Sequence, residues 1–415
     1  MLAYASVGRV SATALALALG VGAALMTGLG VAHADPSENA AVPPAARSGG
    51  AAGPEPIGSA KGSRPGQSGA SAIPRTRKTG LPPRLEAAPE RTATSPVIPV
   101  RHPAIPYANW TAEEKLFTGR SSILSNIVAA TIPLFHGSTG DGLFTAVPPW
   151  YATIGVSTSQ GSSYDMPVWT LQPAIPSGKQ VIAIHGGGYV NEPSLLHWLT
   201  YSRMAAVTGA TVVVPMYPLV PQGGTAVRVV PQMTDFLVDM VGQYGATAVS
   251  VLGDSAGGGL ALAATQEMIR RGEITPAHLV LLSPWLDITL SDPAVSLIDD
   301  PIASPVLGDL VNVAPRWATG LALTDPWVSP LYGPLDGLPA VTVYSGSRDL
   351  TAPDTLRLRT LAIEAHADIS FVLRAGALHD WPLYAPLPDA VVAIRSVYLA
   401  LGITGPPVSP RTDRF

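Results

Sequence analysis

The chain has 415 residues, 47% of them hydrophobic, with 25 Lys and Arg against 29 Asp and Glu and no cysteine. It is long enough to bury a large apolar core. The lack of cysteine excludes disulfide bonds and catalysis by a cysteine thiolate, and no segment resembles a nucleic-acid-binding module. Its chemistry therefore rests on other side chains.

Residues 1–34 have the pattern of an export signal. Arg9 precedes an uncharged apolar run over residues 10–32, and residues 31–34 place small side chains at both positions that a signal peptidase reads. We therefore expect cleavage after Ala34 and a secreted or cell-envelope location for the mature protein. The apolar run is also long enough to span a bilayer, so an uncleaved membrane anchor is the alternative.

Residues 35–104 are expected to form a disordered linker rich in Pro, Ala, Gly and Arg. The segment from Asp35 to Arg101 has no aromatic residue and no apolar periodicity, so it cannot bury enough surface to offset chain entropy. It carries nine Lys and Arg against five Asp and Glu, a net charge of +4, whereas the residues from Ile105 onward carry a net charge of −9. Contact of this basic arm with anionic envelope polymers and plain solvation are the two interpretations.

Residues 105–415 alternate strand and helix in the way that a mostly parallel sheet requires. Eight strands are predicted, the first two antiparallel, at residues 152–159, 166–173, 180–187, 210–218, 248–255, 278–286, 340–347 and 369–376. Helices with apolar residues at three-and-four spacing are predicted at residues 194–209, 226–245, 260–271, 355–367 and 390–402. The nearly continuous apolar strands require helices on both faces of the sheet. The predicted fold class is therefore α/β.

Three glycines, Gly186 to Gly188, follow His185 at the end of the predicted strand QVIAI. A flexible turn is one interpretation of such a run. If a serine elsewhere in the chain attacks a carbonyl group, the glycines also allow backbone N–H groups to converge on the oxyanion that develops. The candidate serine is Ser255. We expect the donors to be the N–H groups of Gly187, Gly188 and Ala256.

Ser255 lies between a predicted strand and a predicted helix, in the pattern G-x-S-x-G formed with Gly253 and Gly257. A serine on so sharp a strand-to-helix turn adopts a strained backbone conformation, and the residues two before and two after it must be small. A Gly/Ser loop that caps a helix is the plainer alternative. The strand before the serine and the helix-prone residues from Leu260 onward favour a nucleophile elbow, with Ser255 as the nucleophile.

Strand direction selects the partners of Ser255. In open α/β sheets the site lies at the carboxyl ends of the strands, so a partner should directly follow a strand. Asp349 follows the predicted strand at 340–347, and His379 follows the one at 369–376. The order Ser255, Asp349, His379 is one of the chain orders in which such triads occur, with His379 as general base and Asp349 as the carboxylate that orients it.

Asp354 and His366 are the rejected candidates for these two roles. Asp354 stands at the start of a predicted helix, where a carboxylate interacts favourably with the helix N-terminus. His366 ends that helix and precedes the last predicted strand, which places it on the opposite edge of the sheet.

Five motifs in combination resemble the hormone-sensitive-lipase branch of the α/β-hydrolases. In chain order they are HGGGY at 185–189, YPLVPQ at 217–222, GDSAGG at 253–258, SPWLD at 283–287 and GSRDLTAPD at 346–354. The resemblance extends from about Tyr151 to Gly402. It implies an α/β-hydrolase fold and a bacterial exported esterase or lipase with a serine nucleophile.

The resemblance also implies structural roles around the serine. The first histidine of HGGG is usually structural in this family, so His185 is expected to support the loop and not to transfer protons. Asp254 is expected to hydrogen-bond nearby backbone. The glycines of the same motifs are expected to be required by the close packing of the turn: Gly186, Gly253 and Gly257.

Two segments are candidates for a small helical cap over the substrate pocket. Residues 110–135 are apolar and aromatic, and residues 289–324 form a long connection that contains the helix-prone stretch LGDLVNVAPRWATGLAL. Either segment would then line an acyl pocket. The alternative is that both are packed helices without ligand contact.

No metal or other cofactor is expected. The sequence contains no HExxH motif, and several histidines are scattered in a way that is typical of surface or packed side chains: His102, His136, His197 and His278.

The expected function is hydrolysis of a small-molecule or lipid carboxylic ester through an acyl-enzyme. One alternative is an acyltransferase that passes the same acyl group to an alcohol or a sugar. Another is a ligand receptor on a hydrolase scaffold. Such receptors usually lose a triad member, whereas all three residues are present in this sequence.

Overall fold

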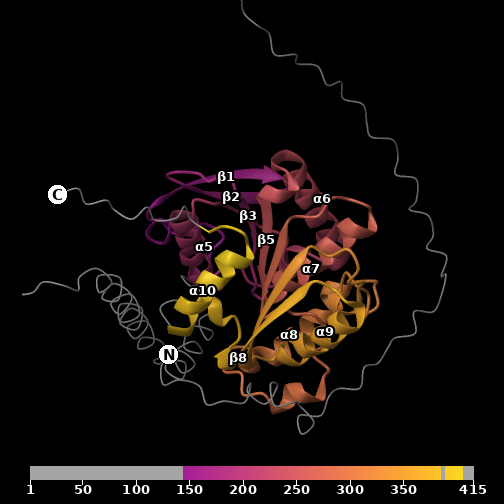
Figure 1. Cartoon of the computed structure of the whole chain (residues 1–415). Coiled ribbons are helices and arrows are strands. Elements are labelled where there is room, and N and C mark those ends of the chain that lie inside the picture. Colours follow the sequence, from indigo (N-terminus) through magenta and orange to yellow (C-terminus); the bar gives the residue numbers. More distant parts are fainter. Residues whose placement is uncertain (1–143, 385–387, 405–415) are drawn as a thin grey trace, which may run out of the picture. The chain divides into compact units, whose positions relative to one another are not determined.

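The chain divides into two units, Met1–Arg101 and His102–Phe415, and the second contains all the residues described here. A computed structural model describes residues 144–384 and 388–404 (Figure 1). The predicted export signal, the linker and the cap candidate at 110–135 lie outside these residues. No helix within the described ranges is long and apolar enough to cross a lipid bilayer.

An eight-stranded sheet organises the described residues, in the order β1-β2-β4-β3-β5-β6-β7-β8. β1 pairs antiparallel with β2, β2 pairs antiparallel with β4, and all remaining pairs are parallel. The strand bounds are β1 Val156–Ser163, β2 Met166–Pro173, β3 Gln180–Ile184, β4 Thr211–Pro215, β5 Val249–Asp254, β6 His278–Leu282, β7 Ala340–Arg348 and β8 Ile369–Leu378. The predicted α/β fold class and its antiparallel opening pair are confirmed.

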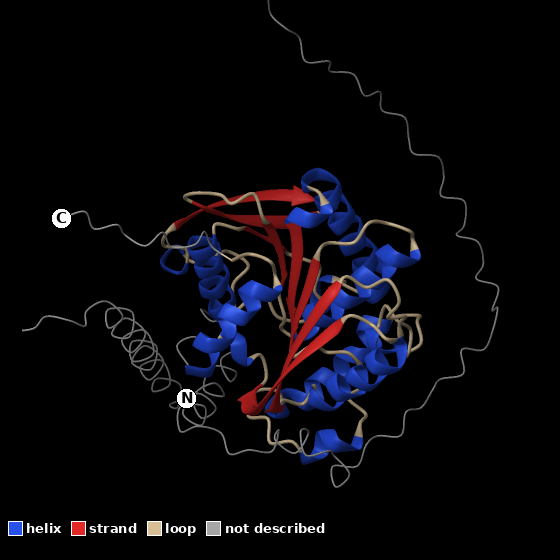
Figure 2. Ribbon diagram, viewed as in Figure 1, coloured by secondary structure: helices blue, strands red, loops and turns tan. Residues whose placement is uncertain are grey.

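Helices cover both faces of the sheet (Figure 2). Side chains alternate along each strand, so Ile182 and Ile184 of β3 enter one apolar core while Val181 and Ala183 enter the other. The first core is closed by α6 (Ala226–Tyr244), α7 (Ser255–Arg270), α8 (Leu307–Ala318) and α9 (Ala352–Ala365). The second is closed by α5 (Leu195–Thr208) and α10 (Pro388–Ala400).

Several predicted boundaries differ from the structure by three or more residues, and the starts of the first strand and of the elbow helix show the physical reason. The first strand begins at Val156 instead of residue 152, because the chain makes a turn there and Gly155 has φ +91°. The elbow helix begins at Ser255 instead of Leu260. Its early glycines are poor helix formers, but a Cβ on Gly259 would lie 2.4 Å from the carbonyl oxygen of Trp285. Close packing of the helix start against the loop after β6 therefore overrides the local propensity.

The long connection at 289–324 contains two 3₁₀ turns, Pro293–Leu297 and Ser304–Val306, followed by α8. The helix starts where the sequence predicted it and ends at Ala318. Val313 and Trp317 of α8 pack into the first apolar core. Whether the connection acts as a cap over substrate stays a prediction.

Candidate active site

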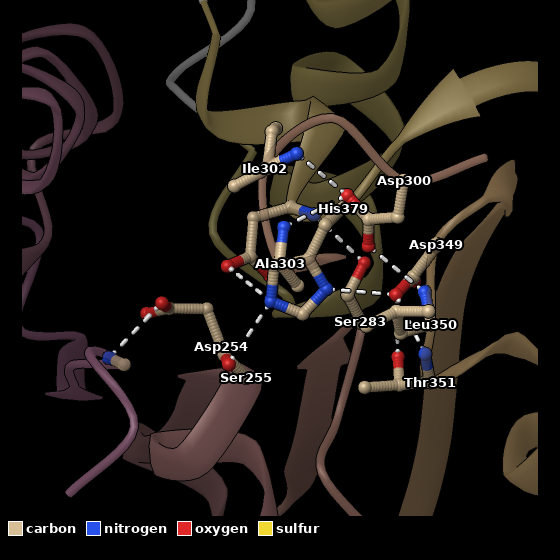
Figure 3. A network of polar contacts seen from close by, with 12 residues as sticks. Asp254, Ser255, Ser283, Asp300, Ile302, Ala303, Asp349, Leu350, Thr351 and His379 are labelled. Atoms are coloured by element: carbon tan, nitrogen blue, oxygen red, sulfur yellow. Dashed lines mark hydrogen bonds and ion pairs between the residues drawn. The ribbon is translucent and has the colours of Figure 1, made fainter. Parts of the chain in front are cut away.

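The three residues selected from strand direction lie at one edge of the sheet. Ser255 directly follows β5, Asp349 directly follows β7, and His379 directly follows β8. These strands run parallel, so their carboxyl ends meet at the same edge. Figure 3 shows the imidazole of His379 between the side chains of Ser255 and Asp349.

Hydrogen bonds connect the three side chains in sequence. The Nε2 atom of His379 lies 3.0 Å from the Oγ atom of Ser255, and its Nδ1 atom lies 2.7 Å from the Oδ1 atom of Asp349. His379 and Asp349 are buried, while Ser255 is partly accessible. The arrangement lets the imidazole exchange a proton with the hydroxyl on one side while the carboxylate fixes its orientation on the other.

Asp349 is held as a charged acceptor. Its Oδ1 atom also accepts hydrogen bonds from the backbone N–H and the hydroxyl of Thr351, and its Oδ2 atom accepts one from Ser345. Burial alone would raise the pKa of Asp349, but the adjacent His379, the backbone N–H of Thr351 and the hydroxyl of Ser283 outweigh burial and lower it. The carboxylate therefore stays ionised next to the imidazole.

Ser255 has the strained backbone that the elbow predicts, with φ +49°. A Cβ on Gly253 would lie 2.5 Å from the carbonyl oxygen of Gly257. A Cβ on Gly257 would lie 2.1 Å from the carbonyl oxygen of Ile184 at the end of β3. Both positions thus require glycine for the physical reason given by the sequence pattern.

The glycine-rich loop packs directly against this turn. A Cβ on Gly186 would lie 3.0 Å from the Cβ of Ser255, and the N–H of Gly186 donates to the Oδ2 atom of Asp254 at 2.9 Å. Gly187 and Gly188 follow with φ +105° and +63°. Ala256 is the second residue of α7, where a backbone N–H has no acceptor within the helix. The loop that carries two of the expected oxyanion donors, Gly187 and Gly188, therefore packs against Ser255. The third expected donor, Ala256, directly follows that serine.

His185 is buried and stacked on Tyr217, with ring centroids 4.6 Å apart. Its Nδ1 atom lies 2.7 Å from the carbonyl oxygen of Gly186. Burial, with a smaller contribution from His197, lowers the pKa of His185 to about 4. The ring is therefore neutral at neutral pH, in keeping with the structural role expected for it.

His197 was not predicted to have a role, yet it contacts Asp254, the residue beside Ser255. Its Nε2 atom lies 2.9 Å from the Oδ2 atom of Asp254, and its Nδ1 atom accepts from the backbone N–H of Ser194 at 2.9 Å. Asp254 accepts the expected backbone hydrogen bond, from Gly186, and its contact with His197 also joins the glycine loop to α5. His197 follows Ser194 by three residues at a helix start, which is the spacing of a capping box, and this spacing was the available signal.

Asp354 lies in the first turn of α9, as predicted, but it is fully buried. Its Oδ1 atom forms an ion pair with Arg357 at 2.7 Å, and Arg357 also reaches Asp287 at 3.3 Å. Burial and then Asp287 raise the pKa of Asp354 to about 7 in spite of Arg357. Burial would lower the pKa of Arg357, but Asp354 and Tyr332 outweigh burial and raise it. The guanidinium therefore stays charged, and Asp354 is the partner that titrates.

Two further carboxylates near His379 were missed from the sequence. The Oδ2 atom of Asp380 lies 3.3 Å from the Nε2 atom of His379. Asp300 is buried in the loop before α8 and accepts hydrogen bonds from the N–H groups of Ile302, Ala303 and Leu350 (Figure 3). Asp380 is the direct neighbour of the predicted base and could have been found by that adjacency, whereas no motif marks Asp300.

Asp300, Asp349 and His379 offer three possible metal-ligand atoms within 4.8 Å of one another. The oxygens of Asp300 already accept backbone N–H groups, and Asp349 is bonded to His379 and Thr351. The possible ligand atoms of this cluster thus already take part in hydrogen bonds.

Helix α8 lies over the glycine loop. The Cδ2 atom of Leu310 is 2.8 Å from the position that a Cβ on Gly188 would occupy. The ring of Trp317 stacks on that of Tyr189, the residue after Gly188, with centroids 3.9 Å apart. Apolar side chains of the 289–324 connection thus border the loop of expected oxyanion donors.

Comparison with known proteins identifies similar chains. Residues 181–383 match the family described as alpha/beta hydrolase fold, a stretch that includes Ser255, Asp349 and His379. The chain is 41% identical to a triacylglycerol lipase of Mycobacterium tuberculosis over 285 residues, which cover 68% of this chain and 60% of that protein. It thus spans less than two thirds of that relative.

Two further matches agree with this one. An esterase of Acinetobacter venetianus is 29% identical over 227 residues, covering 52% of this chain and 72% of the esterase. A solved hormone-sensitive lipase from a metagenome library superimposes with a TM-score of 0.58 at 22% identity, covering 67% of this chain and 97% of that structure. The last match is a likeness of fold.

Proposed function

From the similarity of the chain to α/β-hydrolases, we propose that it belongs to their hormone-sensitive-lipase-like branch and hydrolyses carboxylic esters through an acyl-enzyme on Ser255. The observation that carries the proposal is the continuous hydrogen-bond chain from Ser255 through His379 to Asp349, with distances of 3.0 and 2.7 Å. A serine alone is a poor nucleophile near neutral pH, and a base in contact with its hydroxyl removes that limit.

Acylation begins when the Oγ atom of Ser255 attacks the carbonyl carbon of the ester. The Nε2 atom of His379 takes the hydroxyl proton as the Oγ–carbon bond forms. Asp349 accepts the Nδ1–H hydrogen bond and stabilises the imidazolium. His379 then gives the proton to the leaving oxygen, so that the alcohol departs and the acyl group stays on Ser255.

The negative charge that develops on the carbonyl oxygen requires hydrogen-bond donors beside Ser255. The N–H groups of Gly187, Gly188 and Ala256 are the proposed donors. Support comes from the packing of the glycine loop against the elbow and from the free N–H at the second position of α7. Fixed donors of this kind lower the barrier because they need no reorganisation during the reaction.

Deacylation repeats the same steps with water. His379 takes a proton from water, which attacks the acyl carbon, and then returns a proton to the Oγ atom of Ser255 as the carboxylic acid leaves. The substrate is a small-molecule or lipid ester. Leu310 and Trp317 of α8 border the oxyanion loop, so this helix is the proposed wall of the acyl pocket.

Export from the cell is part of the proposed function. The apolar run with small residues at 32 and 34 supports cleavage after Ala34, and the basic arm over residues 35–104 supports contact with anionic envelope polymers. Both proposals rest on sequence alone.

The test is a panel of nitrophenyl esters, from acetate through butyrate and octanoate to palmitate, assayed with the full chain and its Ser255→Ala variant. We expect the parent to hydrolyse part of the panel and the variant to lose turnover by several orders of magnitude. The acyl chain preferred by the parent defines the size of the acyl pocket. Failure of the folded parent to hydrolyse any ester would contradict the proposal.

Product analysis separates hydrolysis from acyl transfer, because both use the same acyl-enzyme. The assay is repeated with an added alcohol or sugar, and the products are identified by mass spectrometry. A free carboxylic acid as the main product in both cases supports hydrolysis. A new ester of the added acceptor as the main product would make the protein an acyltransferase.

A further inference from the structure

A second carboxylate contacts the working nitrogen of the proposed base. The Nε2 atom of His379 faces the Oγ atom of Ser255 at 3.0 Å and the Oδ2 atom of Asp380 at 3.3 Å. Asp349 occupies the opposite nitrogen at 2.7 Å. The imidazole is therefore bordered by a carboxylate on each side, although the proposed mechanism uses only one of them.

The backbone fixes the carboxylate of Asp380 in this place. Asp380 has φ +54° and ψ +28°, a left-handed conformation that is uncommon for residues other than glycine and asparagine. Its N–H donates to the Oγ atom of Ser283 at 2.8 Å. The residue is 8% exposed, and its Oδ1 atom has no hydrogen-bond partner among the described residues. Burial of a carboxylate with one unpartnered oxygen lowers the stability of the fold. The contact between Asp380 and His379 therefore calls for a functional explanation.

We propose that Asp380 is a positioning residue that holds the imidazolium proton at the Nε2 atom of His379 and thereby sets the pH above which this histidine acts as a base. The inference rests on the proposed ester hydrolysis and extends it to the residue that tunes the base.

The charged and titratable groups around the pair support this role. Besides His379, the carboxylates of Asp349, Asp300 and Asp254 face Asp380, together with two tyrosine hydroxyls, those of Tyr201 on α5 and Tyr384 after the turn at 381–383. Of these carboxylates, Asp349 contacts Nδ1, while Asp300 and Asp254 are bonded to backbone N–H groups. Within the described residues, Asp380 is thus the carboxylate in ion-pair contact with Nε2.

Charge and burial act in opposite directions on this pair. Burial would lower the pKa of His379, but the charge of Asp380, followed by that of Asp349, outweighs burial and raises it well above its usual value of 6.5. Burial, together with Asp254, Asp349 and Asp300, raises the pKa of Asp380 and outweighs the lowering effect of His379. A proton is therefore retained between the two side chains, and it must leave before the lone pair of Nε2 can accept the hydroxyl proton of Ser255.

Two consequences follow for catalysis. The acid limb of the profile of kcat/KM against pH lies at a higher pH than an isolated histidine would give. The reason is that the retained proton prevents His379 from acting as a base. Once the base is free, the same carboxylate stabilises the imidazolium that forms during attack on the ester. Replacing the carboxylate should therefore lower the midpoint of the acid limb and also lower the rate on the plateau.

The test compares the full-length parent with Asp380→Asn and Asp380→Gly. Both replacements tolerate a left-handed backbone, and neither carries a charge. Asp292→Asn is the matched control, because Asp292 is also 8% exposed and its carboxylate accepts the N–H of Ala294 instead of contacting His379. The first measurement is the pH titration of the His379 ring by NMR, with its signals assigned by their loss in His379→Ala. The second is the pH profile of kcat/KM for a nitrophenyl ester.

We expect both Asp380 variants to lower the titration midpoint of His379 by about 1 to 3 pH units. The acid limb of kcat/KM should move by the same amount, and the plateau kcat should fall by less than about tenfold. Asp292→Asn should leave the midpoint and the limb unchanged. An unchanged His379 midpoint in folded Asp380 variants would overturn the inference. A parent that hydrolyses no ester would instead refute the proposed function, and the NMR titration would still decide the role of Asp380.

Discussion

The Nε2 atom of His379 contacts the Oγ atom of Ser255 across 124 residues of sequence. The contact exists because β5, β6, β7 and β8 are neighbours in the sheet and run parallel. Each of the two residues follows the last residue of its strand, so the pairing register of the sheet sets the distance between the proposed nucleophile and the proposed base. The site is therefore a product of sheet topology, and its members can be tested against nearby residues of the same type that the topology excludes.

Asp349→Asn should lower kcat by several orders of magnitude, because the amide cannot stabilise the imidazolium and favours the wrong tautomer of His379. Asp354→Asn should leave kcat within about tenfold of the parent, since Asp354 pairs with Arg357 and not with His379. His366→Asn should also leave kcat unchanged, because His366 ends α9 in a left-handed conformation that asparagine tolerates. Steady-state kinetics on folded variants are the measurement. Equal losses of kcat in Asp349→Asn and Asp354→Asn would refute the assignment.

Gly187→Ala should damage activity more than Gly188→Ala. A Cβ at 187 would lie 2.7 Å from the backbone oxygen of Asn191, which cannot move without displacing the loop. A Cβ at 188 would meet the end of the flexible Leu310 side chain at 2.8 Å and that of Val190 at 3.9 Å, and no backbone atom within 4 Å among the described residues other than its chain neighbours. We expect loss of one oxyanion donor, about 10²- to 10³-fold in kcat, for Gly187→Ala, and a smaller loss for Gly188→Ala. The reverse order of the two variants would contradict the predicted geometry of the loop.

Much of the fold could be predicted from the sequence because its strands are apolar and clearly bounded. β2 has the predicted bounds, and β3 to β8 all fall within or beside the predicted ranges. The errors occurred where packing overrides local preference, at Gly155 before β1 and at the glycines that begin α7. Hydrophobic periodicity reveals neither the helical conformation of the glycines at the start of α7 nor the turn at Gly155 before β1.

The site was predictable only in part. Ser255, Asp349 and His379 follow strands, and motif and topology together select them as candidates. His197 reaches Asp254 from α5 across 57 residues, and Arg357 pairs with a carboxylate expected to be a helix-end group. Such contacts depend on how helices pack on the sheet. The spacing of Ser194 and His197 marks a helix start but does not reveal the contact of His197 with Asp254.

The burial of Asp354 predicts a specific dependence of stability on pH. Its pKa is raised to about 7 in the folded chain, against 3.8 for an ordinary aspartate. The stability it contributes is therefore fully present below pH 3.8 and is lost as the pH rises through 7. Asp354→Asn should remove this dependence, so the stability of the parent relative to the variant should fall between pH 4 and pH 7. Chemical unfolding of both proteins across this range is the measurement, and a constant difference would contradict the raised pKa.

The N-terminal arm should be dispensable for catalysis. Secreted protein should begin at Asp35, and a variant that begins near residue 100 should keep the kcat of the parent. N-terminal sequencing and steady-state kinetics are the measurements. Secreted protein that still begins at Met1 would identify the apolar run as an anchor, and lost activity after trimming would make the arm part of the enzyme.

Covalent labelling of Ser255 tests the central claim most directly. The full chain is treated with a fluorophosphonate, which reacts with activated serines, and the modified peptide is identified by mass spectrometry alongside ester hydrolysis by the parent and by Ser255→Ala. We expect one adduct, on Ser255, and we expect folded Ser255→Ala to lose both the adduct and several orders of magnitude in turnover. An adduct on another residue, or turnover by Ser255→Ala within tenfold of the parent, would contradict the assignment of Ser255 as the nucleophile.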